Sequence, residues 1–249
     1  MILAAGLGAR LRPLTEHTPK ALIEVGGMPL LERVARRLVA AGADRLIVNV
    51  HHYAKRIERF VRERNGFGVE VRFSWEEAEP LDTGGGLLAA APLFRRDAPF
   101  LLHNVDVITD LDLGRMYREH EAHQPLATLA VSDRPTSRPL LVDGEGVYGV
   151  ANHRTGWRRE ARPPRGPTRE LGFAGVHVVS PTVFDLRGLH GAFSIWEPYF
   201  QLVARGRRIL TFDIGQALWL EAGDPDRLER ARTVLAGAPG GRLREETRR

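Results

Sequence analysis

The sequence predicts an α/β fold in which helices cover both faces of a central, mostly parallel mixed sheet, giving three layers. Three observations support this class. Short apolar runs alternate with segments of helical periodicity through the first half of the chain. Strand-like runs dominate the second half, where an aspartate–glycine turn between apolar arms predicts a hairpin over 140–150. A chain of 249 residues with 43% hydrophobic residues can fill the core that such a fold needs.

The elements of the first half follow from the spacing of apolar residues. The run MILAA at 1–5 predicts a first strand, which Gly6 ends. Residues 29–41 repeat apolar side chains at helical spacing, with proline in the first turn and Gly42 as a stop signal. The same reasoning predicts strands at 45–50, 69–75, 98–108 and 125–131, and helices at 53–64, from near Gly86, and at 112–123.

The second half continues the pattern to a closing helix. Asp224 is the expected cap of that helix, over 224–236, and Pro225 takes its first position. No linker divides the chain, so a single domain is predicted over 1–236 and a disordered tail over 237–249. The remaining elements expected are a Pro-rich loop at 158–169, strands at 171–180, 208–214 and 217–223, and a helix at 194–206.

Composition and charge exclude several classes of function. The 36 Lys and Arg residues give a net charge of +5 but are interleaved with 31 acidic residues, so a solvated surface is favoured and no nucleic-acid partner is expected. No window approaches 18 uncharged apolar residues, and the N-terminus lacks the basic lead of a signal peptide. We therefore expect no membrane association and a cytoplasmic location. The absence of cysteine excludes disulfides, thiolate metal sites and cysteine nucleophiles.

The loop after the first strand, within LAAGLGARLRPLTEHTPK at 3–20, is the strongest functional signal. A loop that leaves the carboxyl end of a parallel strand lies at the edge where α/β sheets bind ligands. Gly6 and Gly8 allow backbone amides to approach a ligand closely, and Arg10 and Lys20 add positive charge. These features together suit a triphosphate.

Two common phosphate-binding motifs do not fit this loop. A dinucleotide fingerprint requires a third glycine where Leu11 stands and a helix directly afterwards, which Pro13 opposes. A P-loop requires glycine–lysine–serine or glycine–lysine–threonine, and the sequence contains neither.

The segment LAAGLGARLRPLTEHTPKAL instead resembles the signature of nucleotidyltransferases that make nucleotide-sugars from a nucleoside triphosphate and a sugar 1-phosphate. The mannose-1-phosphate guanylyltransferase and N-acetylmuramate-1-phosphate uridylyltransferase branches are the most similar. The resemblance implies a Rossmann-like nucleotidyltransferase fold, similar to glycosyltransferase A. It also implies that the loop wraps the triphosphate and that EPLDTGGGL at 79–87 faces the base. The nucleotide-binding residues implied in this way are Ala4, Ala5, Gly6, Gly8, Arg10, Lys20, Gly84, Gly85 and Asn104.

The resemblance extends to a metal site and a sugar site. Asp106, within LLHNVDVITD at 101–110, and Glu221, in WLEAGDPDRL, would hold Mg²⁺. Arg10, Lys20 and Asp106 are the implied catalytic residues. The strand LGFAGVHVVS would bind the sugar through Gly172, Phe173 and Gly175, with the two glycines making room for the hexose.

The chain departs from the family pattern at three places. Val105 replaces the glycine that usually precedes the metal aspartate, and Glu221 replaces an aspartate. No lysine follows Lys55, so the lysine that usually grips the sugar phosphate is missing. The arginines that could substitute for it are Arg158, Arg159, Arg162 and Arg169.

The histidines offer no zinc set. His120 and His123 stand three apart on a predicted helix, but nothing nearby completes a metal site, and solvated imidazoles are expected there. His103 lies in the strand leading to Asp106, where a satisfied core histidine is expected.

These observations predict transfer of a nucleoside monophosphate from a nucleoside triphosphate to a sugar 1-phosphate, with release of pyrophosphate. Three alternatives stay open: a non-catalytic nucleotide-sugar sensor with a degraded metal site, a glycosyltransferase of related fold, and nucleic-acid binding through arginine patches. The glycosyltransferase is disfavoured because Asp106 and Asp110 are too far apart for an aspartate–x–aspartate motif.

Overall fold

The structure is a computed structural model that describes residues 1–237 of the 249. The disordered tail predicted at 237–249 lies outside the described residues, apart from Gly237. The short strand β1 (Ile2–Leu3) lies inside the main sheet, parallel to both neighbours, so that Ile2 pairs with Val48 on one side and His103 on the other. The parallel half of the sheet consists of β6 (Phe100–Asn104), β1, β4 (Arg45–Val50) and β5 (Glu70–Trp75), in that order.

The long strand β12 (Arg169–Val179) joins this half to a second, largely antiparallel half. The hairpin predicted over 140–150 forms from β9 (Pro139–Asp143) and β10 (Gly146–Asn152) of that half. In the main sheet of residues 1–237, four strand pairs are parallel and five antiparallel. The predicted mixed α/β sheet is confirmed, but it is not mostly parallel overall, because β12 and the hairpin add antiparallel pairs. The other strands of this half are β8 (Ala127–Ser132), β9 (Pro139–Asp143), β10 (Gly146–Asn152), β11 (Trp157–Glu160) and β13 (Ile209–Asp213).

Two small ribbons lie outside the main sheet. One pairs β2 (Glu24–Val25) with β3 (Met28–Pro29), and the other pairs β7 (Val107–Thr109) with β14 (Trp219–Glu221). The strand predicted at 98–108 is therefore two strands, since the chain leaves the main sheet after Asn104 and pairs with a distant segment.

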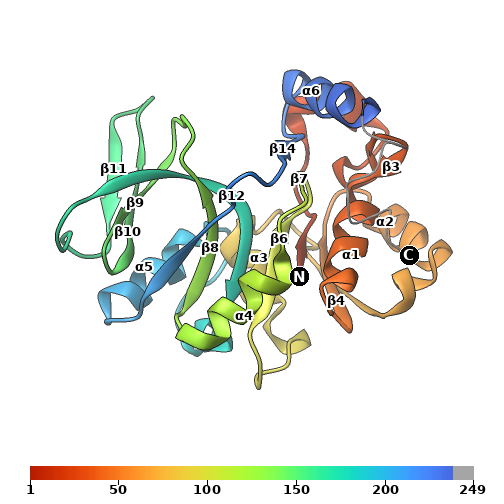
Figure 1. The fold of residues 1–249 in the computed structure, drawn as a ribbon. Coiled ribbons are helices and arrows are strands. Elements are labelled where there is room, and N and C mark those ends of the chain that lie inside the picture. The colour runs from red at the N-terminus through yellow and green to blue at the C-terminus, as the bar shows by residue number, and fades with distance from the viewer. Residues whose placement is uncertain (238–249) are drawn as a thin grey trace.

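Helices cover both faces of the sheet, as predicted (Figure 1). Neighbouring strand residues alternate between two apolar cores: Val48 belongs to a core that also contains Val34 and Met116, whereas Ile47 belongs to one that contains Leu87 and Phe200. No helix within residues 1–237 combines the length and apolar character needed to cross a bilayer. The helices are α1 (Leu30–Ala40), α2 (Ala54–Glu63), α3 (Asp82–Ala89), α4 (Leu113–His123), α5 (Trp196–Ala204) and α6 (Pro225–Ala236).

The boundaries of three elements can be compared with those predicted from the sequence. Asp224 caps α6, since its carboxylate accepts a hydrogen bond from the Arg227 amide at 3.0 Å, as expected. Helix α3 begins at Asp82, earlier than the predicted start near Gly86. The segment 158–169 is not all loop, because β11 pairs along β10 through residue 160.

Candidate active site

The loop after β1 folds into three short 3-10 turns, Ala9–Leu11, Leu14–Glu16 and Lys20–Leu22, with no α-helix before α1. Gly8 has a left-handed backbone with φ of 65°, and a Cβ there would come within 2.8 Å of Thr15 Cγ2. The Thr15 hydroxyl also donates to the Gly8 carbonyl at 2.9 Å. A Cβ at Gly6, by contrast, would meet nothing within 4 Å. Gly8 is therefore needed to fold the turn, while Gly6 keeps a surface open.

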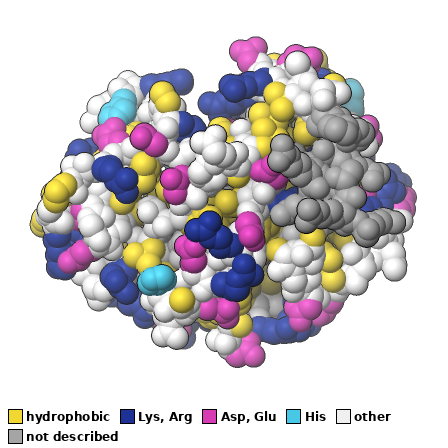
Figure 2. Space-filling view, viewed as in Figure 1, with side chains coloured by type: hydrophobic (Ala, Val, Ile, Leu, Met, Phe, Trp, Pro, Cys, Tyr) yellow, Lys and Arg dark blue, Asp and Glu magenta, His cyan; other side chains and the backbone are white. Residues whose placement is uncertain are grey.

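A cavity of about 220 Å³ opens beside this turn at the carboxyl ends of β1, β4 and β6. The space-filling view shows the surface hollowed between the β9–β11 side and the α6 side, with basic side chains on both rims (Figure 2). The predicted residues that line the cavity are Ala5, Gly6, Lys20, Asn104 and Asp106.

A buried polar network that the sequence analysis missed fixes the floor of the cavity. The Asn49 carboxamide accepts from the Ala4 amide at 2.7 Å and donates to Glu76 Oε1 at 2.7 Å. The other Glu76 oxygen accepts from the Leu81 amide at 2.8 Å. This network ties the ends of β1, β4 and β5 to the start of α3. A polar residue inside the apolar run RLIVNV was the available signal, because buried asparagine requires partners.

Gly84 and Gly85, predicted to face a base, are packed against the loop before α5. Their amides donate to the Phe193 carbonyl at 2.9 and 3.1 Å, and a Cβ at Gly84 would lie 2.6 Å from the Ser194 carbonyl oxygen. A side chain at either glycine would collide with this loop, so close packing of α3 on the loop requires glycine at both positions. The residues of α3 that line the cavity are instead Asp82 and Thr83.

Two carboxylates meet at the mouth of the cavity. Asp106 follows β6 and Glu221 ends β14, and the Ala222 amide donates to the Asp106 carbonyl at 2.8 Å. The point that a Cβ on Gly223 would occupy lies 2.9 Å from Glu221 Oε1, 3.1 Å from Arg10 Nη2 and 3.5 Å from Asp106 Oδ2. Pairing of β7 with β14 thus brings together side chains that are far apart in the sequence.

Both carboxylates have cationic partners. Lys20 Nζ forms an ion pair with Asp106 Oδ2, and Arg227 Nη1 forms one with Glu221 Oε2. Val105, beside Asp106, is buried among apolar residues of the core, so a branched side chain is accommodated there. Four predicted residues, Arg10, Lys20, Asp106 and Glu221, therefore form one charged cluster.

The glycines of the predicted sugar strand have structural neighbours. A Cβ at Gly175, where φ is 79°, would lie 2.6 Å from Val107 Cγ2. A Cβ at Gly172 would lie 2.8 Å from Arg134 Cγ. Protein side chains therefore fill the space at both glycines that was predicted to receive a hexose. Phe173 lies between them, with its ring edge-on to that of His177 at 4.6 Å between centres.

Three of the arginines considered as replacements for the missing lysine are engaged by carboxylates. Arg162 pairs with buried Asp143 through both terminal nitrogens, which holds the pKa of that carboxyl well below its usual range. Arg158 pairs with Glu160, and Arg159 pairs with Glu197. Arg169 is exposed at the start of β12.

Three histidines are buried rather than solvated. His103 is the core histidine expected: its Nδ1 lies 2.8 Å from the Asn104 carbonyl oxygen, and burial lowers its pKa to about 4. His177 Nδ1 lies 3.0 Å from the Tyr199 hydroxyl, and burial lowers its pKa to about 3. The expectation of a solvated His120 is wrong, because α4 packs it against β8, with Nδ1 3.0 Å from Thr128 Oγ1.

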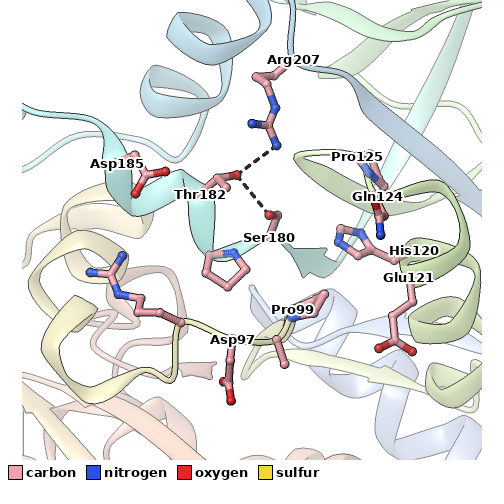
Figure 3. Close-up of a pocket in the computed structure, with 13 residues that line it drawn as sticks. Asp97, Pro99, His120, Glu121, Gln124, Pro125, Ser180, Thr182, Asp185 and Arg207 are labelled. Carbon is pink, nitrogen blue, oxygen red and sulfur yellow. Dashed lines mark hydrogen bonds between the residues drawn. The ribbon is translucent and has the colours of Figure 1, made fainter.

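A second hollow of about 600 Å³ lies at the opposite edge of the sheet (Figure 3). It is lined by residues just before β6 and β8 and just after β12. Arg207 donates to the Thr182 hydroxyl there, but Asp97, Glu121 and Asp185 also line it. The mixed charge makes this hollow unsuited to a triphosphate.

The fold and the charged cluster are those of an α/β protein that binds its ligand at the carboxyl ends of parallel strands, beside a glycine turn. The sequence profile described as "Nucleotidyl transferase" matches residues 1–156, and the chain belongs to this family.

Two groups of curated relatives are similar to the chain. It is 32% identical to the N-acetylmuramate alpha-1-phosphate uridylyltransferase of Caulobacter vibrioides over 246 residues, covering 96% of this chain and 97% of that protein. It is also 32% identical to the mannose-1-phosphate guanyltransferase of Yarrowia lipolytica, covering 90% of this chain but only 60% of that protein.

Solved structures share the fold. A putative glucose-1-phosphate thymidylyltransferase from Bacillus anthracis superposes with a TM-score of 0.78 at 17% identity, covering 96% of this chain and 95% of that chain. The UDP-glucose pyrophosphorylase of Acinetobacter baumannii also gives 0.78, at 19% identity, covering 96% of this chain and 94% of that chain.

Proposed function

We propose that the protein transfers a nucleoside monophosphate from a nucleoside triphosphate to a sugar 1-phosphate and releases pyrophosphate. The observation that carries this proposal is the convergence of Arg10, Asp106 and Glu221 around Gly223, beside the glycine turn and Lys20. Family membership and the activities for which the relatives are named support the same reaction.

In the proposed mechanism, a phosphate oxygen of the sugar 1-phosphate attacks the α-phosphorus in line, and the bond to the β-phosphate oxygen breaks. No protein nucleophile is required, so the protein acts by positioning and charge stabilisation. Gly6 lets the triphosphate lie against the turn, and Asn104 lines the same cavity. Arg10 and Lys20 stabilise the negative charge that gathers on the departing pyrophosphate. The Lys20 ammonium is compact and can follow a moving phosphoryl oxygen.

The donor set fits magnesium. Asp106 and Glu221 are the protein ligands proposed, because an oxygen of each lies within 3.5 Å of the point that a Cβ on Gly223 would occupy. Within residues 1–237, no group of three or more histidine or acidic side chains is placed to hold a metal ion. One or two carboxylates completed by substrate phosphates is how proteins usually hold this ion. Held by these two carboxylates, magnesium would supply positive charge that offsets the repulsion between the two phosphate groups. Lys20 and Arg227 neutralise the same carboxylates in the structure and would then turn toward phosphate oxygens.

A nucleotide-sugar sensor is the second candidate. It is favoured by the ion pairs of Asp106 with Lys20 and of Glu221 with Arg227, which occupy carboxylate oxygens that a metal would need. A sensor would bind nucleotide and sugar without turnover.

A substrate panel separates the two candidates. Five nucleoside triphosphates are combined with mannose 1-phosphate, N-acetylmuramate 1-phosphate and glucose 1-phosphate in the presence of Mg²⁺, and released pyrophosphate is measured. The Asp106→Asn variant is the matched control, because it keeps side-chain size and removes the charge. Turnover by the wild type that falls about 100-fold or more in this variant supports the enzyme. Binding without pyrophosphate release in every combination would leave only the sensor.

A further inference from the structure

Arg134 lies in the turn after β8, at the same edge of the sheet as the candidate active site. Strand β8 runs antiparallel to β12, and β12 runs antiparallel to β6, so β8 and β6 end at one edge. Arg134 follows the last residue of β8, Ser132, by two positions. It was not among the candidate residues in the sequence analysis.

The Arg134 side chain is held between the predicted sugar strand and the strand that ends in Glu221. Its Nη2 donates to the Phe173 carbonyl at 2.8 Å, and its stem covers the space left by Gly172. The guanidinium lies over the Trp219 ring, 4.0 Å from the ring centre. The Glu221 carboxylate, two residues after Trp219 in the sequence, attracts the Arg134 guanidinium electrostatically.

The Arg134 guanidinium has few hydrogen-bond partners among the described residues. Its Nε is buried and has no hydrogen-bond partner, and no carboxylate of residues 1–237 forms an ion pair with it. Burial lowers its pKa, and Glu221 opposes that effect. Nε is enclosed by protein, but of the two terminal nitrogens only Nη2 donates to another described residue, and the side chain as a whole is only half-buried. The terminal nitrogens are therefore suited to a two-point grip on a phosphate.

We propose that Arg134 binds the phosphate of the sugar 1-phosphate, in place of the lysine that the sequence lacks. This assignment rests on the proposed function. Arg158, Arg159 and Arg162 already neutralise carboxylates, whereas Arg134 forms no ion pair within residues 1–237 and lies over Trp219, two residues before Glu221. The sugar phosphate would then lie with Arg134 on one side and the Arg10–Lys20 cluster on the other, so that the attacking oxygen faces the triphosphate.

The test uses three variants and separate Michaelis constants for the two substrates. Loss of a charged hydrogen bond predicts that Arg134→Gln raises KM for the sugar 1-phosphate about 10- to 100-fold and leaves KM for the nucleoside triphosphate within about twofold. Arg134→Lys restores part of the affinity, because it keeps the charge but not the two-point grip. Arg138→Gln is the matched control, since Arg138 is exposed in the same turn, and it should behave as the wild type. Equal rises for both substrates in Arg134→Gln would indicate a merely structural role and overturn the assignment.

A binding measurement keeps this inference distinct from the catalytic proposal. Mannose 1-phosphate and N-acetylmuramate 1-phosphate are titrated against tryptophan fluorescence, with a triphosphate analogue that resists cleavage between its α and β phosphates. The response should disappear in Trp219→Phe, because Arg134 covers that ring. Binding that weakens in Arg134→Gln without any wild-type turnover would overturn catalysis but support this role. Turnover with an unchanged KM for the sugar 1-phosphate in Arg134→Gln would support catalysis but overturn the role of Arg134. Absence of both binding and turnover in the wild type would overturn both proposals.

Discussion

Replacement of Gly223 by alanine tests the charged cluster directly. The added methyl group would lie 2.9 Å from Glu221 Oε1, 3.1 Å from Arg10 Nη2 and 3.5 Å from Asp106 Oδ2, in the middle of the three groups. The first distance is shorter than real carbon–oxygen contacts, so the carboxylate must shift by a few tenths of an ångström. A methyl group there also occupies space that a phosphate or a metal ion needs. Displacement of one oriented charged group predicts a loss in kcat of about 10²–10³, or roughly 3–4 kcal/mol.

The fold should tolerate this change. Gly223 does not have a left-handed backbone, and the atoms nearest the new methyl group are the far ends of flexible side chains. The thermal midpoint should therefore stay within a few degrees of the wild type, while released pyrophosphate falls. Gly144→Ala is the matched control, because its Cβ would meet nothing within 4 Å in the exposed hairpin turn, and it should keep full activity. Turnover of Gly223→Ala within threefold of the wild type would show that this space is not used in the reaction.

Three further outcomes are expected. Lys20→Ala should lower kcat about 10²–10³ with the fold intact, and Lys20→Arg should recover little of it; wild-type turnover in Lys20→Ala would remove the role proposed for the ammonium. Gly8→Ala should lower the free energy of unfolding by about 1–3 kcal/mol, because Gly8 has a left-handed backbone and a Cβ there would meet Thr15. Gly6→Ala should keep the stability of the wild type and raise KM for the nucleoside triphosphate, since a Cβ there would meet no atom of the described residues within 4 Å. Equal urea midpoints for the two variants would contradict this distinction. Burial lowers the pKa of His103 and His120 to about 4 and that of His177 to about 3, from 6.5, so the unfolded chain binds more protons below pH 6.5. Urea unfolding should show that the free energy of unfolding falls by about 1–1.5 kcal/mol for each of these histidines between pH 7 and pH 5.5, or about 4 kcal/mol together, and His177→Gln should remove about a third of that loss.

Local signals predicted the elements whose limits are set nearby in the chain. The cap at Asp224 and the periodicity of 29–41 depend on neighbours within a turn, and both helices form as expected. The charged residues of the opening loop were also predicted, because their spacing is a property of one short segment.

Features set by distant contacts were missed or misplaced. Nothing in the apolar run 98–108 indicates that it breaks at Val105, where the chain turns to pair with residues near 220. The early start of α3 depends on the Phe193 carbonyl, which accepts from two glycine amides. Arg134 could not be distinguished from the other arginines, since its importance comes from the strands that surround it.

The β7–β14 ribbon has a consequence for how the protein becomes active during its synthesis. Asp106 is made early, but its partner Glu221 and the strand that carries it are among the last described residues to leave the ribosome. The nascent chain can complete β1, β4, β5 and β6 long before the two acidic groups meet. We therefore expect that a chain that ends before residue 219 would have the glycine turn but lack the paired carboxylates on which the proposed reaction depends.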